Sequence, residues 1–128
     1  MNTQKNILVL EDNKDNRDLL VRMLERADYT VIAVGDATEA LNMMKATPIH
    51  IMLIDINLPY IDGFEFLKMV HNIPELADVP TIAITASAMR ASRPICLQAG
   101  FDDYLTKPIT RRELLQVVEQ QLNKVSSM

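Results

Sequence analysis

The sequence predicts an α/β fold in which five strands alternate with five helices around one parallel sheet, a single doubly wound (βα)5 unit. Two observations carry this prediction. Short apolar runs without polar alternation recur along the chain, as in strands covered on both faces. The segments between these runs have the apolar spacing of amphipathic helices. The strands are predicted at 7–10, 31–34, 51–54 and 81–84, with a shorter run at 104–105.

Helical periodicity marks three of the intervening segments. Apolar residues recur three and four positions apart at 20–27, 37–44 and 114–122, which places them on one face of a helix. Two of these helices begin with residue pairs that can satisfy unpaired backbone N–H groups. The pairs are Asp36 with Glu39 and Thr110 with Glu113.

The other two helices are predicted mainly from their ends. One begins at Gly63 and ends at about His71. Another begins at 92–94, where Pro94 falls in the first turn and so costs no intrahelical hydrogen bond. Gly100 marks its end.

Length and composition indicate one globular domain at 1–128, with a core at about 6–124 and no output domain. A chain of 128 residues with 48% hydrophobic residues can bury one core. The lone Cys96 agrees with a reducing compartment, and no signal peptide or membrane-spanning run is visible, which predicts a cytoplasmic protein without a membrane partner. A net charge of −4 argues against nucleic-acid binding.

Polar residues follow the apolar runs at the points where the predicted strands end. Because parallel strands point their carboxyl ends to one edge of a sheet, we expect these residues to share a pocket. They are Glu11, Asp12, Asp55, Asn57, Thr85 and Lys107.

The types of these residues indicate phosphoryl chemistry at a magnesium site. Carboxylates about 4 Å apart repel by roughly 4 kcal/mol per pair at an effective dielectric near 20, and a divalent cation removes that conflict. Mg²⁺ prefers oxygen ligands and binds through one or two carboxylates together with phosphate oxygens. Lys107 and the Thr85 hydroxyl suit phosphoryl oxygens, and Asp55 is the candidate nucleophile for an acyl phosphate.

Several of these residues form motifs that resemble those of bacterial response-regulator receiver domains, the CheY-like modules of two-component signalling. The resemblance spans nearly the whole chain, in order, spacing and strand context. The motifs are Glu11-Asp12, Asp55-Ile56-Asn57-Leu58-Pro59 with Asp62-Gly63, Thr85-Ala86 and Lys107-Pro108.

This resemblance implies a fold and a chemistry. The strand order would be the flavodoxin-like 2-1-3-4-5, which periodicity does not show. Asp55 would accept a phosphoryl group from a phospho-histidine of a histidine kinase or a histidine phosphotransfer protein. Asp12 and Asp55 would hold Mg²⁺, or Mn²⁺, with Glu11 acting partly through water and the Asn57 backbone carbonyl completing the shell. A cis peptide is expected before Pro108.

The resemblance also implies a switch. Thr85 would move toward the phosphoryl group, Ala86 would leave the pocket accessible, and Tyr104 would rotate inward. The altered surface would comprise the fourth helix, the strand of Tyr104 and the helix from Thr110, and would meet a downstream protein or a second copy. The first helix, with Asn16 and Arg17 expected to be exposed, would receive the donor.

Each residue taken alone also has a simpler interpretation. Glu11 and Asp12 suit the first turn of a helix through its dipole, and Tyr104 can be core. A basic stretch at 89–94 differs from the acidic residues of many relatives, which leaves the output partner open.

Three functional hypotheses remain. The chain is a stand-alone receiver, or the receiver segment of a hybrid kinase or multidomain regulator, or a Mg²⁺-dependent phosphatase with an aspartyl nucleophile. The phosphatase would want a second acid two positions after Asp55, where Asn57 stands instead.

Overall fold

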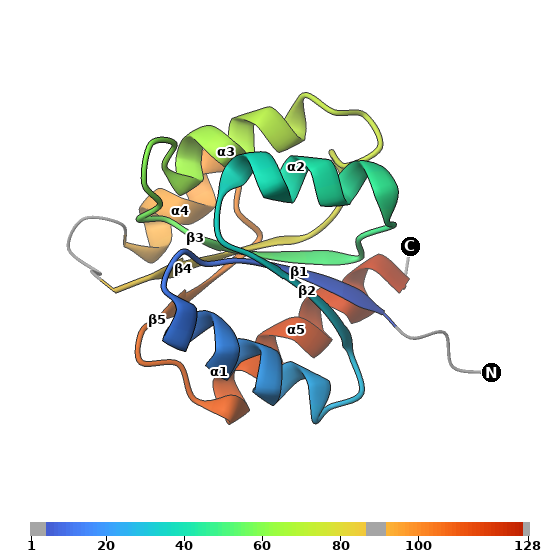
Figure 1. The fold of residues 1–128 in the computed structure, drawn as a ribbon, viewed down its shortest axis with the longest axis vertical. Helices are drawn as coiled ribbons and strands as arrows, with labels where there is room; N and C mark the ends of the chain where they lie inside the picture. Colours follow the sequence, from blue (N-terminus) through green and yellow to red (C-terminus); the bar gives the residue numbers. More distant parts are fainter. Residues whose placement is uncertain (1–4, 87–91, 127–128) are drawn as a thin grey trace.

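The protein folds as a five-stranded parallel sheet with helices on both faces (Figure 1). The computed structural model describes residues 5–86 and 92–126. The strands are β1 (Asn6–Leu10), β2 (Thr30–Val34), β3 (Ile51–Asp55), β4 (Thr81–Thr85) and β5 (Asp103–Thr106). The helices are α1 (Lys14–Glu25), α2 (Ala37–Ala46), α3 (Gly63–His71), α4 (Arg93–Ala99) and α5 (Arg111–Ser126). The predicted α/β class is confirmed.

The strands lie in the order β2-β1-β3-β4-β5, and every neighbouring pair is parallel. This order confirms the one implied by the resemblance. All residues of β3 and β4 are buried, because both strands lie inside the sheet with helices above and below them. A strand that is covered on both faces needs apolar residues at successive positions, which explains the continuous apolar runs of β3 and β4.

The helices form two layers, with α1 and α5 on one face of the sheet and α2, α3 and α4 on the other (Figure 1). Alternate residues of a strand point to opposite faces. In β1, Ile7 and Val9 pack in the cluster that contains α1 and α5 residues, whereas Leu8 and Leu10 pack in the cluster of α2 and α3. The sheet is thereby held between two apolar cores.

The helix ends follow the local chemistry of the sequence. Asp36 Oδ1 accepts a hydrogen bond from the Glu39 backbone N–H at 2.8 Å, so Asp36 caps α2 as predicted. Pro94 lies in the first turn of α4, and Gly100 ends that helix with a left-handed φ of 116°. One boundary differs from the prediction. The predicted helical spacing extends to position 27, whereas α1 ends at Glu25, and Asp28 shortly after it has a left-handed φ of 71° that an α-helix does not contain.

Candidate functional site

The predicted site residues meet at the carboxyl edge of the sheet. Glu11 directly follows β1, Asp55 ends β3 and Thr85 ends β4. Lys107 directly follows β5, and its backbone N–H donates to the Thr85 carbonyl at 2.8 Å. Strand geometry alone brings these four positions together, since all four strands are parallel.

Three carboxylates form the acidic part of the site. Glu11, Asp12 and Asp55 each offer an oxygen, and these oxygens lie within 4.8 Å of one another. Glu11 and Asp55 are buried, at 0% and 1% exposure, whereas Asp12 is exposed. The cluster therefore opens to solvent on the side of Asp12.

Lys107 pairs with both buried carboxylates. Its Nζ lies 2.7 Å from Glu11 Oε1 and 3.1 Å from Asp55 Oδ2. Burial by itself would lower the pKa of Lys107, but the hydrogen bonds to Glu11 and Asp55 outweigh it and raise the pKa. Lys107 is therefore a fixed cation at neutral pH.

One lysine does not neutralise the cluster. The pKa of Glu11 is raised from 4.5 to about 7, mainly by burial and also by the neighbouring Asp55, against the lowering effects of Lys107 and the Asn13 backbone N–H. Among the described residues, Lys107 is the cation that pairs with these carboxylates, so three acids share one lysine. A cluster of oxygens with excess negative charge fits a hard divalent cation such as Mg²⁺.

The loop after β3 holds the Asp55 carboxylate in place. The Asn57 backbone N–H donates to Asp55 Oδ1 at 2.9 Å, while the Asn57 side chain is exposed. Gly63 N–H donates to the Ile56 carbonyl at 2.9 Å, and a Cβ at Gly63 would lie only 2.8 Å from Ile56 Cα. Close backbone packing therefore requires glycine at position 63.

The residues assigned to a switch lie at the carboxyl end of β4, directly after it, and in β5. Thr85 is buried and Ala86 is exposed. Tyr104 is half-buried against the core formed with α2 and α3, and its buried hydroxyl has no hydrogen-bond partner in the described parts of the chain. The Lys107–Pro108 peptide is cis, as the resemblance implied. Ser87 and Arg90, which border this region in the sequence, lie outside the described residues.

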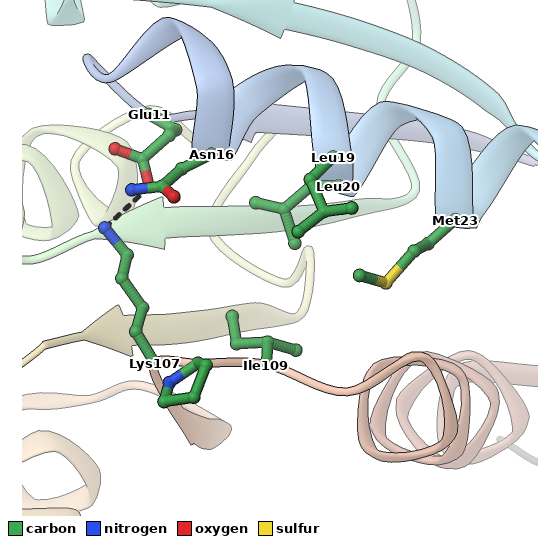
Figure 2. A pocket seen from close by; sticks show the side chains of 8 residues that line it. Glu11, Asn16, Leu19, Leu20, Met23, Lys107 and Ile109 are labelled. Atoms are coloured by element: carbon green, nitrogen blue, oxygen red, sulfur yellow. Dashed lines mark ion pairs between the residues drawn. The ribbon is translucent and has the colours of Figure 1, made fainter.

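A pocket of about 100 Å³ lies between α1 and the connection from β5 to α5, with the Glu11–Lys107 ion pair at one end (Figure 2). Leu19 and Met23 of α1 face Ile109 across it (Figure 2). Leu19 is 47% exposed, so the apolar side of this pocket is open to solvent. The lining comprises Glu11, Asn16, Leu19, Leu20, Met23, Lys107, Pro108 and Ile109.

Asn16 and Arg17 of α1 were expected to be exposed, and the structure contradicts this expectation for both residues. Asn16 and Arg17 are half-buried rather than exposed, because Asn16 lines the pocket and the Arg17 side chain turns toward the loop after β1. Arg17 Nη1 donates to the Glu11 carbonyl at 2.9 Å. Neither the apolar side of the pocket nor this bond was predicted. The signal in the sequence for the pocket was Leu19, an apolar residue that lies outside the helical spacing predicted from position 20.

A family model for the response regulator receiver domain matches residues 7–119, and the chain belongs to this family. The chain is 39% identical over 117 residues to an uncharacterized 14.6 kDa protein of Leptolyngbya boryana, covering 91% of this chain and 89% of that protein. It is 35% identical over 119 residues to the sensor histidine kinase GacS of Pseudomonas protegens, covering 88% of this chain but only 12% of that much longer protein.

A solved structure is similar over most of its length. It is the receiver domain of the sensor histidine kinase PA1611 of Pseudomonas aeruginosa, with a magnesium ion coordinated in its active-site cleft. The TM-score is 0.86 at 33% identity, and the match covers 94% of this chain and 99% of that one. The chain is therefore a receiver module of two-component signalling, as its motifs indicated. No helix in the described ranges is long and apolar enough to cross a membrane.

Proposed function

We propose that Asp55 accepts a phosphoryl group from a phospho-histidine of a partner protein and that the resulting acyl phosphate switches a protein-interaction surface. The Asp55 carboxylate carries this proposal. It is buried at the end of β3, Oδ2 lies 3.1 Å from Lys107 Nζ, and the oxygens of Glu11 and Asp12 lie within 4.8 Å. A buried carboxylate beside a fixed cation and two further acids is an arrangement suited to phosphoryl transfer.

In the proposed transfer, an Asp55 oxygen forms a bond to phosphorus as the bond from phosphorus to the donor's histidine nitrogen breaks. The electron pair of the broken bond stays on the imidazole nitrogen. Lys107 is already within reach of the Asp55 carboxylate and would stabilise charge on the phosphoryl oxygens. The Thr85 hydroxyl would donate a hydrogen bond to one of them.

Mg²⁺ would be held by Asp12 and Asp55, with Glu11 acting partly through water and the Asn57 backbone carbonyl completing the shell. When bound, the ion neutralises charge on the phosphoryl oxygens. The raised pKa of Glu11 supports the site, because both of its causes, burial of the carboxylate and the neighbouring Asp55, are conflicts that a bound cation would relieve. Mn²⁺ suits the same oxygen donors.

The surface that responds would be the face formed by α4, β5 and α5. Thr85 and Ala86 would follow the phosphoryl group, and Tyr104 would move inward in response. The half-buried Tyr104 with an unpartnered hydroxyl supports this role, since a ring that is held by few polar contacts can change position at little cost. A downstream protein or a second copy of the chain would bind this face.

The donor would dock at the pocket between α1 and the β5–α5 connection. This pocket joins an apolar wall of Leu19, Met23 and Ile109 to the polar end where Lys107 reaches Glu11 (Figure 2). A histidine-bearing helix of a histidine kinase or histidine phosphotransfer protein offers both apolar side chains and a phosphoryl group. Nucleic acid and membrane are not among the proposed partners.

We further propose that residues 1–128 act as one receiver domain with its core at about 6–124, and that its chemistry is limited to its own phosphorylation and dephosphorylation. The match to the Leptolyngbya boryana protein over 89% of that protein supports the first part. A cytoplasmic location is proposed as well, and the presence of a single cysteine, the buried Cys96, supports it because the chain cannot form an internal disulfide.

The test is the intact mass of the protein after incubation with Mg²⁺ and a small acyl phosphate. Wild type should gain one labile phosphoryl group that is lost with a chelator, and Asp55→Asn should gain none. Asp62→Asn is the matched control, because Asp62 Oδ1 caps α3 through the Glu65 N–H and asparagine caps equally well. Labelling of Asp55→Asn would overturn the assignment, and multiple turnover of a phosphate ester by wild type would favour a phosphatase.

A further inference from the structure

We propose that Arg17 is a positioning residue for the acidic cluster, because its guanidinium fixes the peptide that joins Glu11 to Asp12, and that Gly35 leaves the space this guanidinium needs. The proposal rests on the proposed function in one respect, since it takes the cluster to be a Mg²⁺ site. It adds two residues, one on α1 and one after β2, that the site's own side chains do not include.

The peptide between Glu11 and Asp12 joins two of the three carboxylate residues of the acidic cluster. It connects a fully buried carboxylate to an exposed one, and the oxygens of both belong to the same cluster. Rotation of this peptide would change the direction of the Asp12 side chain relative to Asp55. The peptide lies past the end of β1, so the sheet does not by itself fix its carbonyl.

Glu11 is held by contacts from several elements. Its backbone N–H donates to the Val34 carbonyl at 3.1 Å, and its Oε2 accepts from the Asn13 N–H at 3.2 Å. The carbonyl accepts from Arg17 Nη1 at 2.9 Å. A buried carbonyl without a donor is unfavourable, so the Arg17 bond both satisfies this oxygen and orients the peptide.

The guanidinium acts here through geometry. In the described ranges no carboxylate lies within ion-pair distance of Arg17, and the bond from its Nη1 is to an uncharged carbonyl. The planar, rigid fork of a guanidinium holds an acceptor in a defined direction better than a flexible ammonium does.

Gly35 explains how the guanidinium reaches this position. A Cβ at Gly35 would lie 3.0 Å from Arg17 Nη1, the same nitrogen that bonds to Glu11. The backbone of Gly35 does not have the positive φ that requires glycine, in contrast to Gly100. A methyl group at position 35 would therefore press on the Arg17 guanidinium and displace it by a few tenths of an ångström, whereas glycine leaves its observed position open.

The experiment titrates the full-length protein with Mg²⁺ alone and follows backbone amide resonances. Arg17→Ala should weaken Mg²⁺ affinity about tenfold, the lower end of the effect of residues that orient metal ligands. Gly35→Ala should weaken it less, and the double variant should bind no more weakly than Arg17→Ala, because both changes act through one guanidinium. The matched control Arg22→Ala removes an exposed arginine of the same helix and should leave the affinity unchanged.

A fall in stability of Arg17→Ala with wild-type Mg²⁺ affinity would overturn the proposal, and so would additive effects of the two substitutions. If Arg17→Ala does not fold, Arg17→Lys replaces it and should weaken binding by a smaller factor. The Asp12 amide resonance of the metal-free protein gives a separate readout. It should shift in Arg17→Ala but not in Arg22→Ala, and an unshifted resonance would contradict the positioning role. Failure of wild type to bind Mg²⁺ would instead contradict the proposed metal site.

Discussion

Glu11 is the residue at which burial and charge conflict most strongly. It has no exposed surface, it lies beside the Asp55 carboxylate, and its pKa is raised to about 7. A buried acid keeps its proton when the charged form is poorly solvated. Without metal, Glu11 should therefore keep its proton up to about pH 7, whereas in the unfolded chain it releases the proton near pH 4.5.

This difference predicts how stability depends on pH without metal. The stabilisation by protonated Glu11 is fully present below the unfolded pKa of 4.5 and is lost as pH rises through about 7. Relative to Glu11→Gln, the free energy of unfolding of wild type should therefore fall between about pH 5 and pH 8. Chemical denaturation in a chelator measures it. His50 has a lowered pKa, which changes stability with pH in the opposite direction. Because His50 is present in both proteins, its contribution cancels in the difference between wild type and Glu11→Gln. A constant difference between the two proteins would contradict the raised pKa.

Thr85 allows phosphorylation and switching to be separated. Thr85→Ala removes the hydroxyl but keeps the Thr85 carbonyl that accepts from the Lys107 N–H. The variant should still gain one phosphoryl group by mass, while the phosphorylation-induced shift of the Tyr104 resonances should be much smaller than in wild type. Asp55→Asn gives the baseline without phosphate. A full shift in Thr85→Ala would remove Thr85 from the switch.

At the scale of elements, α4 is the helix least anchored by apolar contacts. Cys96 is its buried residue, while the remainder of the helix is exposed. A polar network joins α4 to β5 and α5 instead: Arg93 Nη1 lies 3.1 Å from Asp103 Oδ1, and buried Gln121 donates to Asp103 Oδ2 at 3.3 Å. One buried carboxylate, that of Asp103, therefore links all three elements of the face proposed for output.

Substitutions at Arg93 and at Asp103 should lower the free energy of unfolding by different amounts. Arg93 is 57% exposed, so Arg93→Ala should destabilise the protein by less than about 1 kcal/mol. Asp103→Ala should cost about 1–3 kcal/mol, because it removes one of the two acceptors of the buried Gln121 amide, leaving the Asp102 carbonyl, and removes the side-chain acceptor of the Tyr104 N–H. Urea denaturation of both variants decides this. Equal costs would show that Arg93, and not the buried part of the network, holds the face together.

Local chemistry explains which elements could be predicted from sequence. The bounds of α3 and the cap of α2 depend on residues close in sequence, Gly63, His71 and Asp36, and the structure agrees with them. The order of strands depends on contacts between distant segments, because several orders bury the same apolar runs. It was available only through family resemblance.

The same distinction applies to the site. Glu11, Asp55 and Lys107 were predictable because each stands where a strand ends, and parallel strands bring those ends together. The bond from Arg17 to the Glu11 carbonyl and the burial of Asp103 depend on side-chain positions across elements. In the sequence alone, both residues look like ordinary surface charges.

For the whole molecule, the sheet separates two apolar cores, and the acidic site lies at the one edge where β1, β3, β4 and β5 all end. The site oxygens come from the end of β3 and from the loop directly after β1, and both strands pack in both cores. The repulsion between these carboxylates therefore lowers the free energy of unfolding of the whole domain, since unfolding would move the carboxylates apart. Any cation that binds the cluster should stabilise the molecule as a whole and not one loop.

The unfolding temperature should consequently rise with Mg²⁺ concentration. A ligand that binds the folded state alone adds RT ln(1 + [L]/Kd), about 1.4 kcal/mol at ten times Kd. Asp12→Ala removes the exposed carboxylate of the cluster and should abolish most of this rise, while its stability in chelator should equal or exceed that of wild type because one repulsive charge is gone. Asp15→Ala, a nearby acid in the first turn of α1, is the control and should keep the full rise. An Asp12→Ala protein stabilised by Mg²⁺ as much as wild type would exclude Asp12 from the ligands and leave Glu11 and Asp55 to hold the ion.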